Sequence, residues 1–239
     1  MVNRTSVIKW AFSSVVFQKQ TATCVAFYIA TCTVPLFDKS QGEVPSLFDS
    51  YGIGYLNIMS LLRFLILQLM PLYIIGAGIS TTYDKNIFFR VRLLRSSEWQ
   101  KALEATLLVI TGGFCSLRLA CSLFSKELSN PNILVHGKAI FLCYFLAILE
   151  SFASALLLVN LYTRLRSATG VFLILFFLYF GVALLPFHYY PFGLSSYSRV
   201  QMLSPTIDDS YRIAFIYLIV IVFLLHVWLR SGVRKYLRS

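Results

Sequence analysis

Long apolar segments are the feature of this sequence that most limits how it can fold. Six of them have 18 or more residues each, and they lie at residues 20–37, 56–79, 102–125, 139–161, 169–187 and 212–230. At a rise of about 1.5 Å per residue, such a run is long enough to cross the ~30 Å hydrocarbon core of a bilayer as a helix. We therefore predict an all-α integral membrane protein with six transmembrane helices. We expect residues 1–239 to form a single transmembrane domain.

Charged residues are correspondingly scarce. Of the 239 residues, 58% are hydrophobic and only 13% are charged, whereas soluble proteins usually carry about 25% charged residues. The formal net charge is +11, which in a soluble protein would suggest binding to nucleic acid. In a membrane protein such an excess reflects topology, because Lys and Arg are retained on the cytoplasmic side. We expect no nucleic-acid partner.

The distribution of Lys and Arg predicts the orientation of the chain. With both termini cytoplasmic, the inner segments carry 14 of these residues and the outer segments carry 5, which is the asymmetry expected of that topology. Before the first apolar segment, residues 5–19 place Val7, Ile8 and Phe12 at near-helical spacing, with Lys9 on another side. This segment either lies in the membrane interface as an amphipathic helix or extends the first transmembrane helix.

The connection between the second and third apolar segments concentrates cationic and aromatic residues. These residues are Phe88, Phe89, Arg90, Arg92 and Arg95. We predict a short helix from Asp84 to about Arg95, followed by a break and by a new helix that starts near Glu98.

The sequence Ser97-Glu98-Trp99-Gln100 supports the break, because it matches a capping box in which Ser97 caps the amide of Gln100 and the Gln100 side chain reaches back. Trp99 is then expected at the membrane surface. The neighbouring arginines have two interpretations. They can be topology signals beside anionic headgroups, worth about 1 kcal/mol each, or part of a docking element, since Arg and aromatic side chains dominate interface energetics.

Among the ionisable residues inside apolar segments, we single out Arg63, Arg118 and Glu150. Such residues are costly in lipid and usually face the interior of a bundle or water. We place the two arginines roughly 10 Å and the glutamate roughly 16 Å from the outer surface, a difference that an Arg side chain can cover. The three residues form either a structural ion pair or a polar site on a transport path.

Sequence motifs for enzyme chemistry are missing. The sequence has no G-x-x-x-x-G-K-[ST], so we expect no ATP site of the P-loop kind. It also lacks a zinc pattern, because the histidines His136, His188 and His226 are far apart and none of the five cysteines is in a C-x-x-C pair. We expect the cysteines to pack as small hydrophobic residues, and we expect no catalytic residue and no metal site.

The segment after the fifth apolar run is aromatic and rich in proline. Within residues 186–211 it begins with Pro186, Phe187, His188, Tyr189, Tyr190 and Pro191. Aromatic residues favour the headgroup region of a bilayer. We therefore expect this segment to lie half-embedded at the outer surface.

Several of these features together resemble a known family. The passage "FRVRLLRSSEWQKALEA" before the third apolar segment, "LLPFHYYPFGLSSYSRVQML" after the fifth and the basic tail "FLLHVWLRSGVRKYLRS" resemble the membrane subunits of type-2 ABC transporters. The small six-span permeases of bacterial peptide export and antimicrobial-peptide immunity are the closest in layout. The chain departs from that pattern just before Trp99, where Ser97-Glu98 replaces the usual Arg-Lys pair.

The resemblance implies a permease subunit of an ABC exporter that moves a peptide or an amphipathic substrate. ATP and Mg²⁺ would be bound by a separate ATP-binding subunit, and this chain would hold no cofactor. The other partners would be the lipid bilayer and a second copy of the permease or a related one. The location would be the bacterial cell membrane, with several spans and both termini cytoplasmic.

The resemblance also implies roles for particular segments. Residues 5–19 would form an elbow helix, and residues 186–211 would form an outer gate. The connection between the second and third spans would be a coupling helix that docks the ATPase through Phe88, Phe89, Arg90, Arg92, Arg95, Ser97, Trp99 and Lys101. Two other functions stay open: a non-transporting membrane anchor or sensor subunit, and an intramembrane enzyme that uses Glu150 and a histidine.

Overall fold

The computed structural model describes residues 19–33, 58–85, 96–124, 137–184 and 207–238, and within these ranges all regular secondary structure is helical. The helices are α2 (Lys19–Thr33), α3 (Ile58–Lys85), α5 (Ser96–Phe124), α7 (Gly137–Leu165), α8 (Ala168–Leu184) and α9 (Ile207–Arg238). Each of the six predicted apolar segments overlaps one of these helices. The predicted all-α class is therefore confirmed.

Three of the described helices are long and apolar enough to span a membrane. The candidate spans are Gln100–Cys121 in α5, Tyr144–Leu165 in α7 and Arg212–Gly232 in α9. Shorter apolar stretches occupy Leu65–Ser80 in α3 and Ala168–Gly181 in α8. By length and composition, the chain is thus a helical membrane protein.

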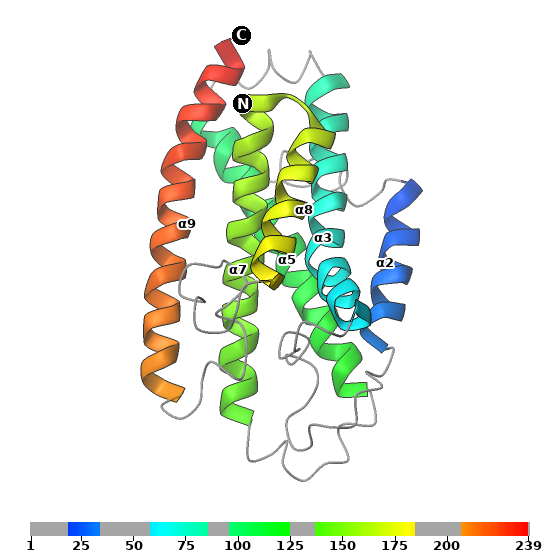
Figure 1. Ribbon diagram of the computed structural model, residues 1–239. Coiled ribbons are helices and arrows are strands. Elements are labelled where there is room, and N and C mark those ends of the chain that lie inside the picture. Colours follow the sequence, from blue (N-terminus) through cyan, green and yellow to red (C-terminus); the bar gives the residue numbers. More distant parts are fainter. Residues whose placement is uncertain (1–18, 34–57, 86–95, 125–136, 185–206, 239) are drawn as a thin grey trace.

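Helix α7 is the centre of the bundle, because it packs against α3, α5, α8 and α9. The helices run side by side, with α9 at one edge and α2 at the other (Figure 1). Helix α9 packs mainly against α7 and also contacts α5, whereas α2 contacts α3 and α5. Helix α8 lies against α3 and α7.

The main core lies where α3, α5, α7 and α8 meet. Its most deeply buried members include Leu72, Ile75, Leu107, Leu156, Val159 and Leu175. In α7, Ala153 and Ala155 are fully buried, and small residues of this kind allow helices to approach closely in a membrane. Two smaller clusters hold the edge helices, one with Tyr28 on α2 and one with Leu218 on α9.

A tight turn joins α7 to α8. Arg166 adopts a positive φ of 54°, the left-handed conformation that commonly ends a helix. The Ser167 hydroxyl then accepts a hydrogen bond from the Gly170 amide at 3.1 Å, as an N-cap residue does. The cap explains why α8 starts directly after so short a connection.

Several predicted features lie outside the described residues. They are most of the interfacial segment 5–19, the connection 86–95 and the outer segment 186–206. Helix α5 begins at Ser96, two residues before the predicted start at Glu98. Ser97 is therefore already inside the helix, and the capping box is wrong in this detail.

Candidate functional site

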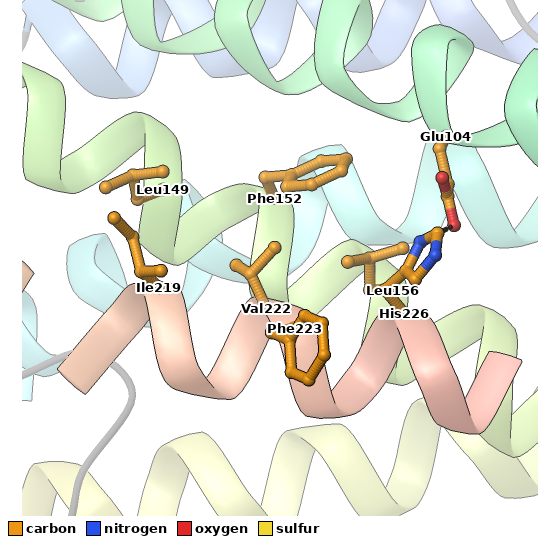
Figure 2. A pocket seen from close by; sticks show the side chains of 8 residues that line it. All are labelled: Glu104, Leu149, Phe152, Leu156, Ile219, Val222, Phe223 and His226. Atoms are coloured by element: carbon orange, nitrogen blue, oxygen red, sulfur yellow. Dashed lines mark hydrogen bonds and ion pairs between the residues drawn. The ribbon is translucent and has the colours of Figure 1, made fainter. Parts of the chain in front are cut away.

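A pocket of about 250 Å³ lies between α5, α7 and α9 (Figure 2). Its lining residues are Glu104 from α5, Leu149, Phe152 and Leu156 from α7, and Ile219, Val222, Phe223 and His226 from α9. Residues three, four and seven positions apart share one face of a helix, which explains the sets that α7 and α9 contribute. The pocket therefore follows directly from the pattern of α7 and α9.

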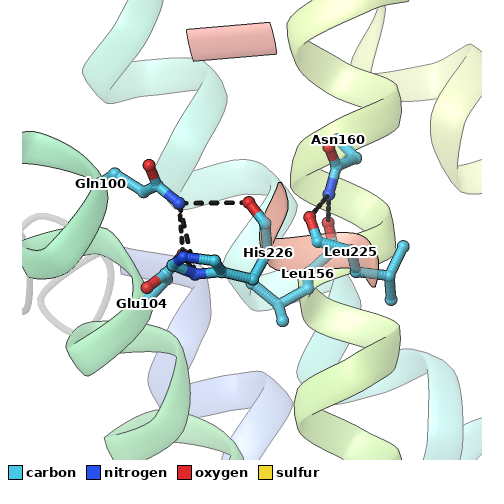
Figure 3. Close-up of polar contacts among 6 residues, drawn as sticks. All are labelled: Gln100, Glu104, Leu156, Asn160, Leu225 and His226. Carbon is cyan, nitrogen blue, oxygen red and sulfur yellow. Dashed lines mark hydrogen bonds and ion pairs between the residues drawn. The ribbon is translucent and has the colours of Figure 1, made fainter. Parts of the chain in front are cut away.

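Two ionisable residues, Glu104 and His226, lie at one end of the pocket. The Nδ1 atom of His226 lies 2.7 Å from Oε1 of Glu104, and the Gln100 amide donates to the same oxygen at 2.8 Å. Gln100 also donates to the backbone carbonyl of His226 at 3.2 Å (Figure 3). Gln100 and Glu104 are four residues apart on α5, so both face α9. This polar pair, Glu104 and His226, ties α5 to α9.

The hydrogen bond assigns the proton on the imidazole. A carboxylate only accepts hydrogen bonds, so with Glu104 ionised Nδ1 of His226 is the donor. The other ring nitrogen, Nε2, is then a lone-pair acceptor when the ring is neutral. The Gln100 amide nitrogen also lies 3.4 Å from Nδ1 of His226. Because Nδ1 is then a donor as well, these two nitrogens are in contact but do not share a hydrogen bond.

The pair lies inside candidate membrane spans. Glu104 is four residues into the span of α5 and His226 is six residues from the end of the span of α9, which places them roughly 6 Å and 9 Å from those ends. The Glu104 side chain is 17% exposed and that of His226 is 44% exposed. Ionisable residues inside a span mark a functional site by default, and this pair meets that criterion.

A polar seam between α7 and α9 continues from the same end of the pocket. Asn160 donates to the backbone carbonyls of Leu156 at 2.9 Å and Leu225 at 3.0 Å (Figure 3). Its Oδ1 atom is buried and has no hydrogen-bond partner within the described part of the chain. Of the two polar atoms of the Asn160 side chain, it is therefore the amide nitrogen that joins α7 to α9.

The seam tightens toward the ends of the two helices. A Cβ atom added to Gly232 would lie 2.8 Å from Oγ1 of Thr163, so the backbones approach closely there. The Arg164 guanidinium lies 4.5 Å from the ring centroid of Trp228, a cation–π distance. It also donates to Ser231 at 3.4 Å.

A second polar group lies around Glu150, deeper in the bundle. Glu150 is 1% exposed, and Glu150 and Arg118 both act electrostatically on the Cys115 thiol. The sulfur of Cys115 lies 3.5 Å from the Ser151 hydroxyl. Arg118 of α5 and Glu150 of α7 are thus placed around the same buried thiol.

Most of the remaining predicted site residues lie outside the described part of the chain. Lys101 is exposed on α5, whereas the side chains of Arg63, Ser97 and Trp99 lie outside the described part. The other predicted docking and gate residues are also outside it, namely Phe88, Phe89, Arg90, Arg92, Arg95, Pro186, His188, Tyr189, Tyr190 and Pro191.

Sequence reasoning missed the polar pair. It assigned Gln100 to a local capping box, but the side chain bonds to Glu104 and to α9 instead. The pairing of His226 with Glu104 spans 122 residues, so no local motif reveals it. Both residues lie near the predicted cytoplasmic ends of their spans. This shared depth in the membrane was the signal in the sequence that could have paired them.

Among the described residues, no group of three or more His, Cys, Asp or Glu side chains is placed to hold a metal ion. Comparisons of the chain with protein-family models, with curated proteins and with solved structures find no match.

Proposed function

We propose that this chain is the membrane-spanning permease subunit of an ABC exporter, in which a separate subunit hydrolyses ATP and a peptide or amphipathic substrate is moved. The observation that carries the proposal is the start of α5. There the family-like passage "RSSEWQKALEA" runs into a membrane helix, and that helix is bonded to α9 within its first turns.

This arrangement suggests how a cytoplasmic movement reaches the bundle. Lys101 is exposed on one face of α5, while the neighbouring Gln100 is only 4% exposed and bonds to α9. A displacement at the exposed face would therefore move Gln100 and Glu104 together with His226. Asn160 and Gly232 pass the displacement from α9 to α7, which contacts most of the other helices.

The proposed topology has six spans, an interfacial elbow helix at residues 5–19 and both termini in the cytoplasm. Helix α8 has 17 residues, or about 26 Å, and a span this short is accommodated by local thinning or by its flanking residues. Cysteines introduced at Ser40 and Ser129 should react with an impermeant thiol reagent from outside intact cells. Cysteines at Ser96 and Ser239 should be protected, and external labelling of Ser96 contradicts this topology.

Docking of the ATPase is tested by reversing charge at Arg90, Arg92 and Arg95. If these residues bind an ATP-binding subunit, the triple Glu variant should stay in the membrane but lose that subunit in a pull-down from solubilised membranes. Charges that serve only topology would instead give an inverted or degraded chain. A matched control is Lys126→Glu, which changes a charge on the predicted outer side. An intact complex with normal ATP turnover after the triple change contradicts the proposal.

A further inference from the structure

The Arg164 guanidinium, at the end of the seam between α7 and α9, is held in place but only partly used. Its described contacts are the ring of Trp228 and the Ser231 hydroxyl, to which it donates one hydrogen bond. A guanidinium group has five N–H donors, so most of them bond to no described residue. Because Arg164 is exposed, these donors are open to a ligand.

The charge of Arg164 is not balanced by the helices that surround it. Helix α7 after Glu150, all of α8 and helix α9 after Asp209 contain no Asp or Glu. Glu104 of α5 lies at the same end of the bundle, but it is bonded to His226. The Arg164 end of the seam therefore attracts anions.

An apolar stripe on α7 leads from Arg164 into the membrane. Arg164 is the last but one residue of the candidate span of α7, and Ser231 has the same place in that of α9, so both lie at one edge of the membrane. Leu157 and Leu161 share the face of Arg164, because residues three and seven positions apart lie on one side of a helix. Both leucines are half-buried. Over these seven residues the stripe is about 10 Å long.

The adjoining face of α9 has the same order of apolar and polar residues. Leu224, Trp228 and Ser231 are four and seven positions apart and share one face, and Leu224 is 60% exposed. Since Arg164 contacts both Trp228 and Ser231, the two stripes lie side by side with their polar ends together. The seam thus presents a cation and a hydroxyl at the membrane edge and an apolar strip toward the middle of the membrane.

We propose that the Arg164 end of the seam between α7 and α9 binds an anionic phospholipid. The guanidinium donates to the phosphate group, and one acyl chain lies along the strip formed by Leu157, Leu161 and Leu224. Basic sites between transmembrane helices at the membrane edge bind acidic lipid head groups, and the planar Arg fork matches phosphate oxygens. The ring of Trp228 holds the guanidinium in position before the lipid arrives. A choline phospholipid has no net charge and gains less from this site.

Lipid binding needs neither a substrate nor an ATPase, so the test uses the purified full-length chain in lipid bilayers. Trp10 and Trp99 are replaced by Phe, which leaves Trp228 as the only tryptophan. Bromine atoms on an acyl chain quench a tryptophan that they touch, so quenching of Trp228 reports the lipid at this site. We expect brominated phosphatidylglycerol to bind about fivefold more tightly than brominated phosphatidylcholine, because one cation near the surface contributes about that factor.

Two variants distinguish a site from general surface charge. Arg164→Gln removes the proposed phosphate ligand and should abolish most of the preference for the anionic lipid. The matched control is Arg230→Gln, which removes another exposed cation at the same end of α9. Arg230 lies four residues after His226 and hence on the side that faces α5, so this change should leave the preference intact.

A second measurement needs no substitution. The unaltered chain is photolabelled with phosphatidylglycerol that carries a diazirine in one acyl chain, and the labelled residues are identified by mass spectrometry. We expect labels at Leu157, Leu161 or Leu224. Glycerol phosphate, which is the head group without its chains, is added at constant ionic strength and should not compete.

Four outcomes overturn the proposal. The first three are equal quenching of Trp228 by the two brominated lipids, a preference that Arg164→Gln leaves unchanged, and an equal loss of preference in Arg230→Gln. The fourth is photolabelling that avoids the strip on α7 and α9. If glycerol phosphate abolishes the labelling, the site takes a free phosphate, and the assignment to a lipid is wrong.

Discussion

Helices α7 and α9 pack against each other, yet they occupy opposite kinds of environment. In the candidate span of α7, 56% of the residues are buried, compared with 22% in that of α9, although α9 is the more hydrophobic of the two. Helix α7 buries polar residues such as Glu150, Ser154 and Asn160, whereas α9 exposes large residues such as Ile216 and Leu224. The more apolar of these two spans is therefore the more peripheral one.

The difference has a physical cause in the solvent. Lipid tails are as apolar as leucine side chains, so burying a leucine against protein gains little, and helices associate through close packing and polar bonds. Helix α7 has the small residues and hydrogen-bonding groups that provide both. In a soluble bundle the order would be reversed, because water would drive the most apolar helix to the centre.

The largest effect is expected from a substitution among the buried polar residues of α7. If Glu150 neutralises Arg118, then Glu150→Gln leaves a half-buried cation unpaired, a change that destabilises by up to about 3–5 kcal/mol. Combining Glu150→Gln with Arg118→Gln should restore part of the loss. Stability is measured in detergent as the temperature at which the buried thiols Cys32 and Cys115 become reactive.

If Glu150→Gln alters neither stability nor substrate transport, then Glu150 has neither the structural nor the transport role. Reduced transport with unchanged stability would instead place Glu150 on a transport path. The double variant separates these cases, because only an ion pair predicts recovery of stability.

An intermediate effect is expected when one leucine of α7 and one leucine of α9 are each replaced by alanine. Leu146 on α7 is 0% exposed and Leu224 on α9 is 60% exposed. Leu146→Ala should destabilise the protein by about 2 kcal/mol, at the low end of the range for core truncations. In lipid the substitution loses packing contacts, but it does not also lose the free energy of transferring a leucine out of water. Leu224→Ala should stay within about 0.5 kcal/mol. Equal losses in the thermal assay would mean that the exposed face of α9 is covered by protein.

The smallest effect concerns glycines. Gly232→Ala places a methyl group against Thr163, which would lie 2.8 Å from the new carbon, and should destabilise by about 1 kcal/mol because the Thr163 side chain has to move. Gly113→Ala meets nothing within 4 Å and should stabilise α5 by up to about 1 kcal/mol through helix propensity. Opposite signs in the same thermal assay confirm the close approach of α7 and α9, and equal signs refute it.

The helices were predictable from sequence for one reason: each includes most of a long apolar run. Their arrangement was not, because hydropathy ranks α9 above α7 while burial ranks them in the reverse order. Burial of Glu150 followed from the cost of an ionisable group in lipid. The bond between Gln100 and His226 could not be predicted in this way. The local sequence predicts a capping bond for the Gln100 side chain, but in the structure that side chain bonds to α9 instead.

The tight turn at Arg166 and Ser167 has a consequence for the order of assembly. A connection this short makes α7 and α8 a helical hairpin, and the hydroxyls of Ser154 and Tyr179 bond within it. Contacts between near neighbours in sequence form fastest, since they close the shortest loops. We therefore expect the hairpin to form early as the chain enters the membrane, with α9 joining last along the seam of Asn160. The last helix to dock is also the easiest one to displace, and α9 forms one wall of the pocket.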